Sequence, residues 1–197
     1  DGDGGTSSTS TVTVTVSASN DDPVLGSLDG GSVAYAEGDG AVSMDADATV
    51  TDSDSADFST GTLTVTIASG EDAAEDELSI EHVGSGAGEI GVSGSNVSHA
   101  GTEIGTFTGG SSGNPLVITL DSDATEAETQ ALLRKITYEN TDTSDPTTGG
   151  RGVTFVLTDG DGGTSSTSTV TVTVSASNDD PVLGSLDGGS VAYAEGD

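Results

Sequence analysis

Apolar and polar residues alternate one by one along much of the chain, as in β-strands that bury one face. The clearest runs read TVTVTV, at residues 11–16 and again at residues 169–174. Glycine- and serine-rich stretches separate the runs, as in antiparallel sheets with one face in water. The other predicted buried rows are Leu63, Val65 and Ile67; Leu116, Ile118 and Leu120; Val153, Phe155 and Leu157; and Leu78 with Ile80, with Tyr35 as a further core candidate.

One segment follows helical spacing instead. Residues 125–128 read TEAE, a capping box in which the threonine and the second glutamate are expected to satisfy each other's backbone amides. Arg134 and Lys135 follow, where the dipole at a helix end favours cations. We therefore predict a helix over about residues 125–135, running straight into a strand at residues 136–138, within an all-β sandwich of two antiparallel sheets. Its helical spacing rests on Ala124, Ala127, Ala131 and Leu132.

The first 39 residues return without a mismatch as the last 39, at an offset of 158 residues. Solenoids repeat every roughly 20–50 residues, so this longer period is that of a domain in a tandem array. The break between domains is predicted at NDDP, residues 20–23 and 178–181, because proline interrupts strands and Asn and Asp favour turns. Residues 1–22 are then the C-terminal strand and linker of one repeat, residues 23–180 a complete repeat, and residues 181–197 the start of the next. The chain has no initiating Met, so we expect it to be a window cut from a longer array.

The chain carries 34 acidic and only 3 basic residues, a net charge of −31. This balance argues against nucleic-acid phosphates and anionic membrane surfaces as partners. No apolar run approaches the ~20 residues of a membrane span, and the absence of cysteine excludes disulfides and thiolate metal sites. Leu, Ile, Val and Phe total only 39 of 197 residues, which together with this charge is typical of disordered chains. A folded domain therefore needs both a patterned core and something that neutralises the charge.

The acids gather at turn-like places outside the strand rows. Calcium prefers six to eight hard oxygen ligands, and several carboxylates held close together repel one another strongly unless a cation lies between them. Calcium binding is therefore predicted, against two alternatives: ordinary Asp-Gly turns and the acidic surface of a protein adapted to high salt. No EF-hand loop and no GGxGxD tract is present. The four acidic clusters are Glu37-Gly38-Asp39, Asp52-Ser53-Asp54 with Asp57 nearby, Asp159-Gly160-Asp161, and Asn178-Asp179-Asp180.

Four strings carry a family resemblance. They are NDDPVL at residues 178–183, similar to an NDAPVL linker, DSD at 52–54, LLRKITYENT at 132–141, and VTFVLTDGDGGTSS at 153–166. With them the chain resembles a cadherin-like tandem repeat of very large secreted bacterial adhesins of the RTX or biofilm-associated type. The resemblance implies an immunoglobulin- or cadherin-like β-sandwich, an extracellular place at the cell surface, and calcium ions between successive domains.

The resemblance also implies two sets of metal ligands. At the near end of the repeat they are Asp52, Asp54 and Asp159 with the linker residues Asn20, Asp21 and Asp22, and Asp161 is a further candidate there. At the far end they are Glu37 with Asn178, Asp179 and Asp180. The sequence departs from animal cadherins in its shorter linker, in the missing LDRE-type motif and at residues 70–140, which have no counterpart. Fewer ions per junction are therefore expected.

The resulting hypothesis is a structural spacer in an extended adhesin arm, stiffened by calcium against its identical neighbouring repeats. Strand exchange is one alternative, because residues 1–22 and 159–180 are identical and compete for the same groove. A glycan-binding module is another, although the repeat has no Trp and only five aromatic residues to offer a sugar. We expect no enzyme, since His82 and His99 are the only histidines and no motif marks a nucleophile.

Overall fold

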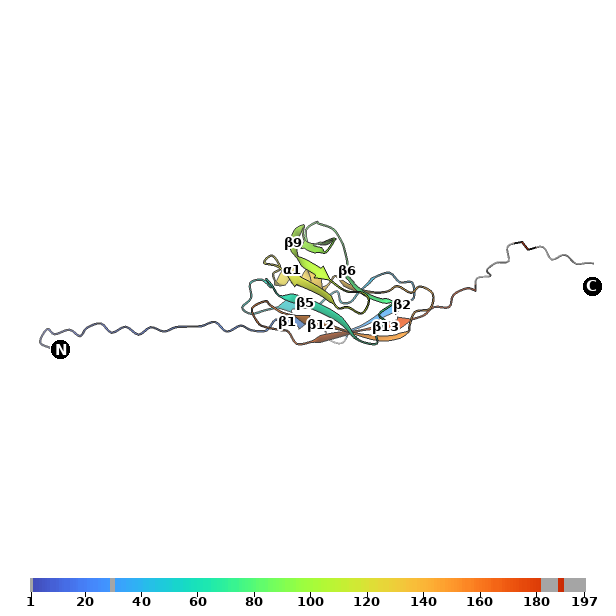
Figure 1. Cartoon of the computed structure of the whole chain (residues 1–197). Coiled ribbons are helices and arrows are strands. Elements are labelled where there is room, and N and C mark those ends of the chain that lie inside the picture. Colours follow the sequence, from blue (N-terminus) through green and yellow to red (C-terminus); the bar gives the residue numbers. More distant parts are fainter. Residues whose placement is uncertain (1, 29–30, 182–187, 190–197) are drawn as a thin grey trace, which may run out of the picture.

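The computed structural model describes residues 2–28, 31–181 and 188–189. A single β-rich body begins at the buried Pro23, and its last strand ends at Ser175. The chain enters and leaves this body at opposite ends (Figure 1). Such a body can be joined to further copies end to end without folding back on itself.

The larger sheet has eight strands, in the order β2-β13-β12-β5-β10-β9-β8-β7. Its strands pair antiparallel, apart from β13, which runs parallel to the edge strand β2. The last strand of the body, β13, therefore lies between β12 and the edge strand β2. The bounds are β2 Ser32–Ala36, β5 Thr62–Ser69, β7 Ile90–Ser93, β8 Asn96–His99, β9 Thr102–Thr108, β10 Leu116–Leu120, β12 Gly149–Leu157 and β13 Ser168–Ser175.

Smaller elements cover one face of this sheet. A three-stranded sheet has the order β3-β11-β6, with β3 Val42–Ser43, β11 Ile136–Asn140 and β6 Asp76–Ile80. A two-stranded sheet pairs β1 Val24–Gly26 with β4 Thr49–Thr51. The helix α1 spans Glu126–Leu133 and leads directly into β11.

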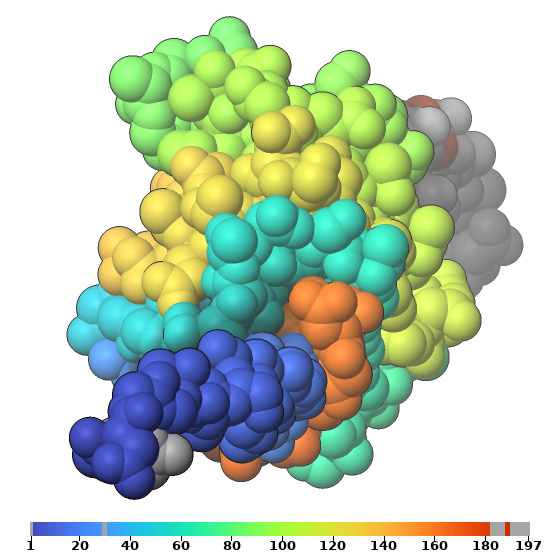
Figure 2. Space-filling view, turned by 90° about the vertical axis from the view of Figure 1, so that its left-hand side faces the viewer, coloured from blue at the N-terminus to red at the C-terminus, as the bar shows by residue number. Residues whose placement is uncertain are grey.

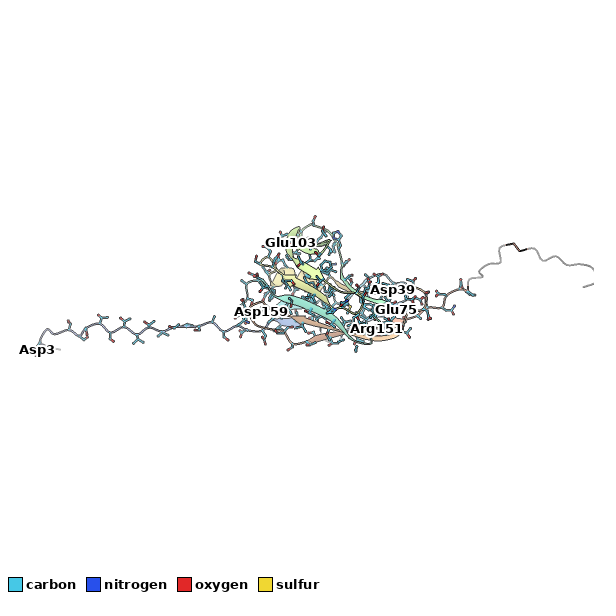
Figure 3. All side chains as sticks on the ribbon, in the orientation of Figure 1. Asp3, Asp39, Glu75, Glu103, Arg151 and Asp159 are labelled. Carbon is cyan, nitrogen blue, oxygen red and sulfur yellow. The ribbon has the colours of Figure 1, made fainter. Side chains whose placement is uncertain are left out.

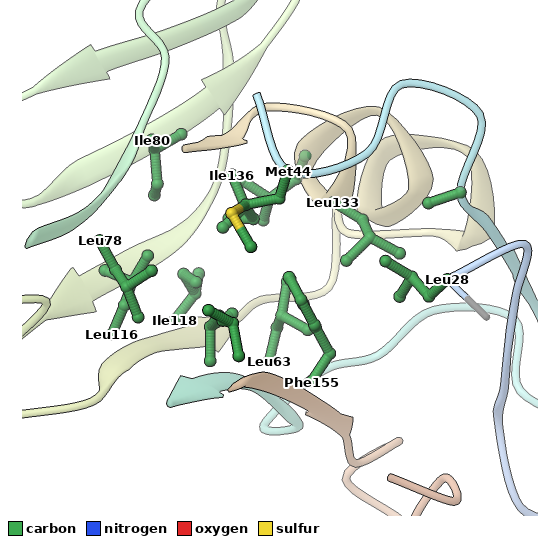
Figure 4. Packing of buried hydrophobic residues seen from close by; sticks show 14 of the residues in the cluster. Leu28, Met44, Leu63, Leu78, Ile80, Leu116, Ile118, Leu133, Ile136 and Phe155 are labelled. Carbon is green, nitrogen blue, oxygen red and sulfur yellow. The ribbon is translucent and has the colours of Figure 1, made fainter. Parts of the chain in front are cut away.

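The core lies between these layers, and the rows predicted from alternation form it. Along β5 the burial alternates strictly, with Leu63, Val65 and Ile67 inside and the intervening threonines at the surface. Figure 4 shows Leu63 and Phe155 from the large sheet facing Leu133 of the helix and other side chains of the covering layer. The described residues thus form an all-β sandwich with one short helix, as predicted, but their strands make three sheets rather than two, and β13 pairs parallel with β2. The other predicted buried residues, Leu78, Ile80, Leu116, Ile118, Leu120, Val153, Leu157 and Tyr35, are also buried.

The helix lies within the predicted segment, but two details of its prediction were wrong. Thr125 is the N-cap, yet its side chain makes no capping bond to the backbone; its hydroxyl donates to the carboxylate of Glu128 instead. Ala127 is exposed, and the buried helix residues are Thr129, Leu132 and Leu133. The two basic residues after the helix are used as anchors, with Arg134 Nε donating to Ala48 O at 2.7 Å.

The strand predicted at residues 11–16 is not formed, whereas the identical sequence at residues 169–174 lies in β13. Residues 6–19 are exposed and extended, and they lead away from the body (Figure 1). A strand needs a neighbouring strand for its backbone bonds and a core for its apolar face. Residues 11–16 have neither here. The predicted start of the next repeat, residues 181–197, lies largely outside the described residues.

Candidate metal centre

The linker that enters the body lies against two acidic loops at the near end. Asn20 Nδ2 donates to Asp159 Oδ2 at 2.7 Å, and the Asp21 backbone N–H lies 3.2 Å from both carboxylate oxygens of Asp54. Asp22 Oδ1 accepts the backbone N–H of Thr164 at 3.0 Å. In Figure 2, which views the molecule from this side, the blue linker meets the cyan and orange chain segments that carry these loops. Three segments distant in sequence, which the resemblance assigned to one site, therefore come together.

Asp159 is the best-fixed carboxylate of this group and is only 1% exposed. Its Oδ1 accepts the backbone N–H groups of residues 161, 162 and 163 at 2.8–3.0 Å. Glycine is required at position 163, because a Cβ there would lie 2.2 Å from Asp159 Oδ2 and 2.8 Å from the Asp21 carbonyl oxygen. Burial, the largest single influence, raises the pKa of Asp159, but the Asn20 amide and the three backbone donors outweigh it and hold the pKa below its ordinary value.

The turn at residues 52–54 holds two carboxylates, and that of Asp54 contacts the linker. Asp52 Oδ1 accepts the backbone N–H groups of Asp54 and Ser55, each at 3.1 Å. The Asp21 backbone N–H, the largest influence, lowers the pKa of Asp54, yet desolvation and the neighbouring carboxylates of Asp52 and Asp21 outweigh it and raise that pKa. Negative charge is therefore concentrated here beyond what the hydrogen bonds compensate.

The other oxygen of Asp52, Oδ2, is buried and has no hydrogen-bond partner within the described residues. A buried carboxylate oxygen without a partner is costly, so it marks a place where a cation or a water is expected. The hydroxyl of Ser55, in the same turn, is also buried with no partner in the described part of the chain. Asp52 lines a cavity of about 240 Å³ together with Asp22 of the linker, which was predicted from the sequence to bind calcium.

Glu126 belongs to this site and was missed from sequence. Its Oε1 accepts the backbone N–H of Asp52, which ties the first turn of α1 to the acidic turn. From the sequence, residues 125–128 are predicted only as a helix start. Ser53 was missed as well, and its hydroxyl donates to Asp21 Oδ2 at 2.7 Å. An acid in the first helical turn is the one signal that was available, and it is equally typical of helix capping.

The far end has a simpler arrangement around Glu37. Glu37 Oε2 accepts the backbone N–H of Ser177 at 2.8 Å, while its Oε1 is buried without a partner in the described part of the chain. This is the second orphaned carboxylate oxygen, at the opposite end of the body from Asp159; Figure 3 labels Asp39, close to Glu37 in sequence, at this end. The outgoing linker residues are exposed, and Asn178 Nδ2 bonds only to the Asp179 carbonyl oxygen at 3.2 Å. Asp179 and Asp180 are not gathered around Glu37.

Two predicted acids stay outside the cluster. The side chain of Asp161 is exposed, and only its backbone N–H contacts Asp159. Asp57 accepts the Ser59 backbone N–H at 3.0 Å and so serves its own turn. Across the described ranges, no three acidic or histidine side chains are arranged as a ready-made metal site. The carboxylates instead accept N–H groups from the linker and from their own loops.

The residues present fit a hard cation. The near end offers carboxylate and amide oxygens with no imidazole or thiol donor among them, which suits calcium rather than zinc. Among the described residues, one buried carboxylate oxygen without a partner lies at each end, on Asp52 and Glu37, and both were predicted ligands. Asp52, Asp54, Asp21 and Asp159 are therefore the candidate ligands at the near end, and Glu37 is the candidate at the far end.

The histidines lie elsewhere. His82 lies just beyond β6 and is exposed, and its Nδ1 accepts the Val92 backbone N–H at 2.8 Å. His99 Nδ1 lies 3.5 Å from Glu128 Oε1 beside a cavity of about 390 Å³. Neither imidazole takes part in the acidic clusters.

Comparison with known protein families, curated proteins and solved structures finds no match for this chain. In the part of the chain that the structure describes, no helix is both long and apolar enough to span a membrane.

Proposed function

We propose that residues 23–180 form a structural spacer repeat of an extracellular adhesin arm, and that calcium bound at the junctions fixes each repeat to the next. The observation that carries this is the convergence at the near end. There the linker contacts Asp54 and Asp159, beside a buried oxygen of Asp52 that has no partner in the described residues. The placement of the two linkers at opposite ends supports an extended array (Figure 1).

Calcium would also resolve the electrostatic problem of a repeat with 27 acidic and 3 basic residues. Extracellular calcium modules bind with dissociation constants of about 10⁻⁴–10⁻³ M, so their sites fill outside the cell and empty in the cytosol. Such a repeat would be exported without metal and gain its stiffness after secretion, at the cell surface.

A glycan-binding role has less support. Sugar sites commonly use an exposed aromatic ring, but four of the five aromatic residues of the repeat are fully buried. They are Tyr35, Phe58, Tyr138 and Phe155, and Phe107 is half-buried. Their rings pack in the core and are not exposed to a sugar.

The test is thermal unfolding of the 197-residue chain in millimolar calcium and in chelator, at matched high sodium. Calcium should raise the melting temperature, because a ligand that binds only the folded state stabilises it. Asp54→Asn should lose most of this calcium-dependent rise. In chelator the same variant should be at least as stable as the parent, because the neighbouring Asp52 and Asp21 carboxylates repel the Asp54 charge and raise its pKa.

Glu77→Gln is the matched control, since Glu77 is exposed on β6 and the substitution also removes one negative charge. It should keep the full response to calcium. An unchanged melting temperature in chelator would eliminate calcium from the proposal and leave the acids as a surface adapted to high salt.

A further inference from the structure

The same nine residues, TSTVTVTVS, occur in two opposite environments. As residues 167–175 they include β13, where Val170, Val172 and Val174 are 0%, 0% and 2% exposed. As residues 9–17 they extend into solvent, and Val12, Val14 and Val16 are 83%, 80% and 89% exposed. Identical sequence means identical capacity for pairing, so residues 9–17 are a β13 strand without its sheet.

The groove that β13 occupies is bounded by β12 on one side and by β2 on the other. β13 pairs antiparallel with β12, with Val172 opposite Arg151, and parallel with β2, with Val172 opposite Val33. Ser175 Oγ donates to the Tyr35 carbonyl oxygen at 3.1 Å at the far end of the strand. Residues 9–17 of any copy would make each of these contacts at an offset of 158 residues.

The chain cannot place residues 9–17 in the groove of its own body. If residues 9–17 lay in this groove in the same direction as β13, Ser17 would take the place of Ser175 opposite Ala36, at the far end of the body. Asn20, however, is bonded to Asp159 at the near end. Eight strand residues span about 25 Å, whereas the three residues that lead from Ser17 to Asn20 reach at most about 11 Å. Within residues 1–197 no second groove is described, so the groove of a second copy of this chain is the one that fits the strand.

We propose that residues 9–17 of one molecule take the place of β13 in a second copy of this chain when that copy's own β13 is displaced, joining the two head to tail. Residues 18–22 of the donor then cross the junction as residues 176–180 do in the covalent chain, because these sequences are identical too. The contact uses different surfaces on the two partners, so it repeats without closing and builds an open filament. The exchange reproduces the tandem array without a peptide bond and does not depend on calcium.

Two equivalent valines give the test, run on the full 197-residue chain with and without calcium. Val172→Asp places a carboxylate in the buried β13 and disables the chain's own strand, while its donor segment stays intact. Val14→Asp makes the same change at the equivalent exposed position of the donor. Oligomer size is measured by light scattering after size-exclusion chromatography, and folding by circular dichroism and thermal melting.

We expect Val172→Asp to be folded and to form oligomers that lengthen with concentration, with at least tenfold more oligomer than the parent chain. The double variant should be monomeric and unfolded, and Val14→Asp alone should remain a monomer that melts like the parent. A synthetic peptide of residues 6–22 should convert the Val172→Asp oligomers into folded monomers, whereas the same peptide with the Val14→Asp change should not.

A Val172→Asp chain that stays monomeric, whether folded or unfolded, overturns the proposal. Equal oligomers from the double variant overturn it as well, because they would show association that does not use the donor strand.

Discussion

Arg151 is the residue that sequence patterning could not place. It is 1% exposed, although arginine is almost never fully buried without a partner. Its Nε donates to Asp76 Oδ2 at 2.7 Å and its second terminal nitrogen to the Thr147 carbonyl oxygen at 2.6 Å. Asp76 in turn accepts the hydroxyl of Tyr138 at 2.6 Å and the amide of Asn140 at 3.1 Å. A buried polar network thus ties β12 to β6 and β11 inside an otherwise apolar core.

Removing only the cation of this pair should destabilise the fold more than neutralising both partners. Arg151→Met leaves the Asp76 carboxylate buried without its cation, which typically destabilises a protein by about 3–5 kcal/mol. Adding Asp76→Asn removes that uncompensated charge and should recover part of the loss. Urea unfolding of the two single variants and the double variant measures the non-additivity.

Lys135→Met provides the surface comparison, because Lys135 pairs with Glu81 at 2.8 Å with both side chains substantially exposed. Lys135→Met should lower the free energy of unfolding by about 1 kcal/mol or less. Equal losses for Arg151→Met and Lys135→Met would contradict the assignment of a buried network.

Asp159 gives a pH dependence whose direction follows from its lowered pKa. Its carboxylate stabilises the fold fully above the unfolded pKa of about 3.9, and this stabilisation is lost as the pH falls through the lower folded value. Asp159→Asn should therefore be less stable than the parent at pH 6, with the difference shrinking toward pH 2. Denaturant unfolding in chelator measures this without contribution from metal. A difference that stays constant from pH 6 to pH 2 would show that the charge of Asp159 is not what matters.

At the scale of elements, alternation predicted β5, β6, β10, β12 and β13 but not their partners, and it missed shorter strands such as β1, β4 and β8. The buried rows of β5, β10 and β12 were readable because one face of each strand is apolar. The start of β12 was not, because residues 149–152 read GGRG and carry no apolar signal. The parallel pairing of β13 with β2 depends on a contact between residues about 140 positions apart, which no local pattern encodes.

The strand prediction at residues 11–16 failed for a related reason. Local alternation shows that a segment is able to form a strand, but a sheet must be present to receive it. At residues 169–174 the sheet is present and the prediction is right; at residues 11–16 it is wrong, with the same letters. The capping-box prediction failed for a local reason. The Thr125 hydroxyl donates to the Glu128 carboxylate and not to a backbone group of the helix.

The acidic residues of the candidate site were predicted from the sequence, but their detailed contacts were not. The convergence of the linker with Asp54 and Asp159 followed from the family resemblance, and the structure places these residues in contact. Glu126 and Ser53 were not predicted, because a helix-start glutamate and a turn serine are common for reasons unrelated to ligands.

At the scale of the whole molecule, the arrangement of the two ends decides what an array can do. The incoming linker is bonded to the body through Asn20, Asp21 and Asp22, whereas the outgoing linker beyond Ser177 makes few bonds to its own body within the described residues. Each linker is therefore held by the repeat that follows it more than by the repeat that precedes it. The hinge of the array is then expected at residues 176–178, beside the orphaned oxygen of Glu37.

Calcium at that hinge should convert a jointed chain into a stiff one. In a tandem array of several repeats, the maximum dimension measured by small-angle X-ray scattering should grow in proportion to repeat number when calcium is present. In chelator it should grow more slowly, because the free linkers let successive bodies reorient. Glu37→Gln in every repeat should make the array flexible even with calcium, while Glu77→Gln should leave it stiff. An array whose dimension is the same in chelator would locate its stiffness in the linker–body hydrogen bonds alone, and the Glu37 oxygen would then have no role at the junction.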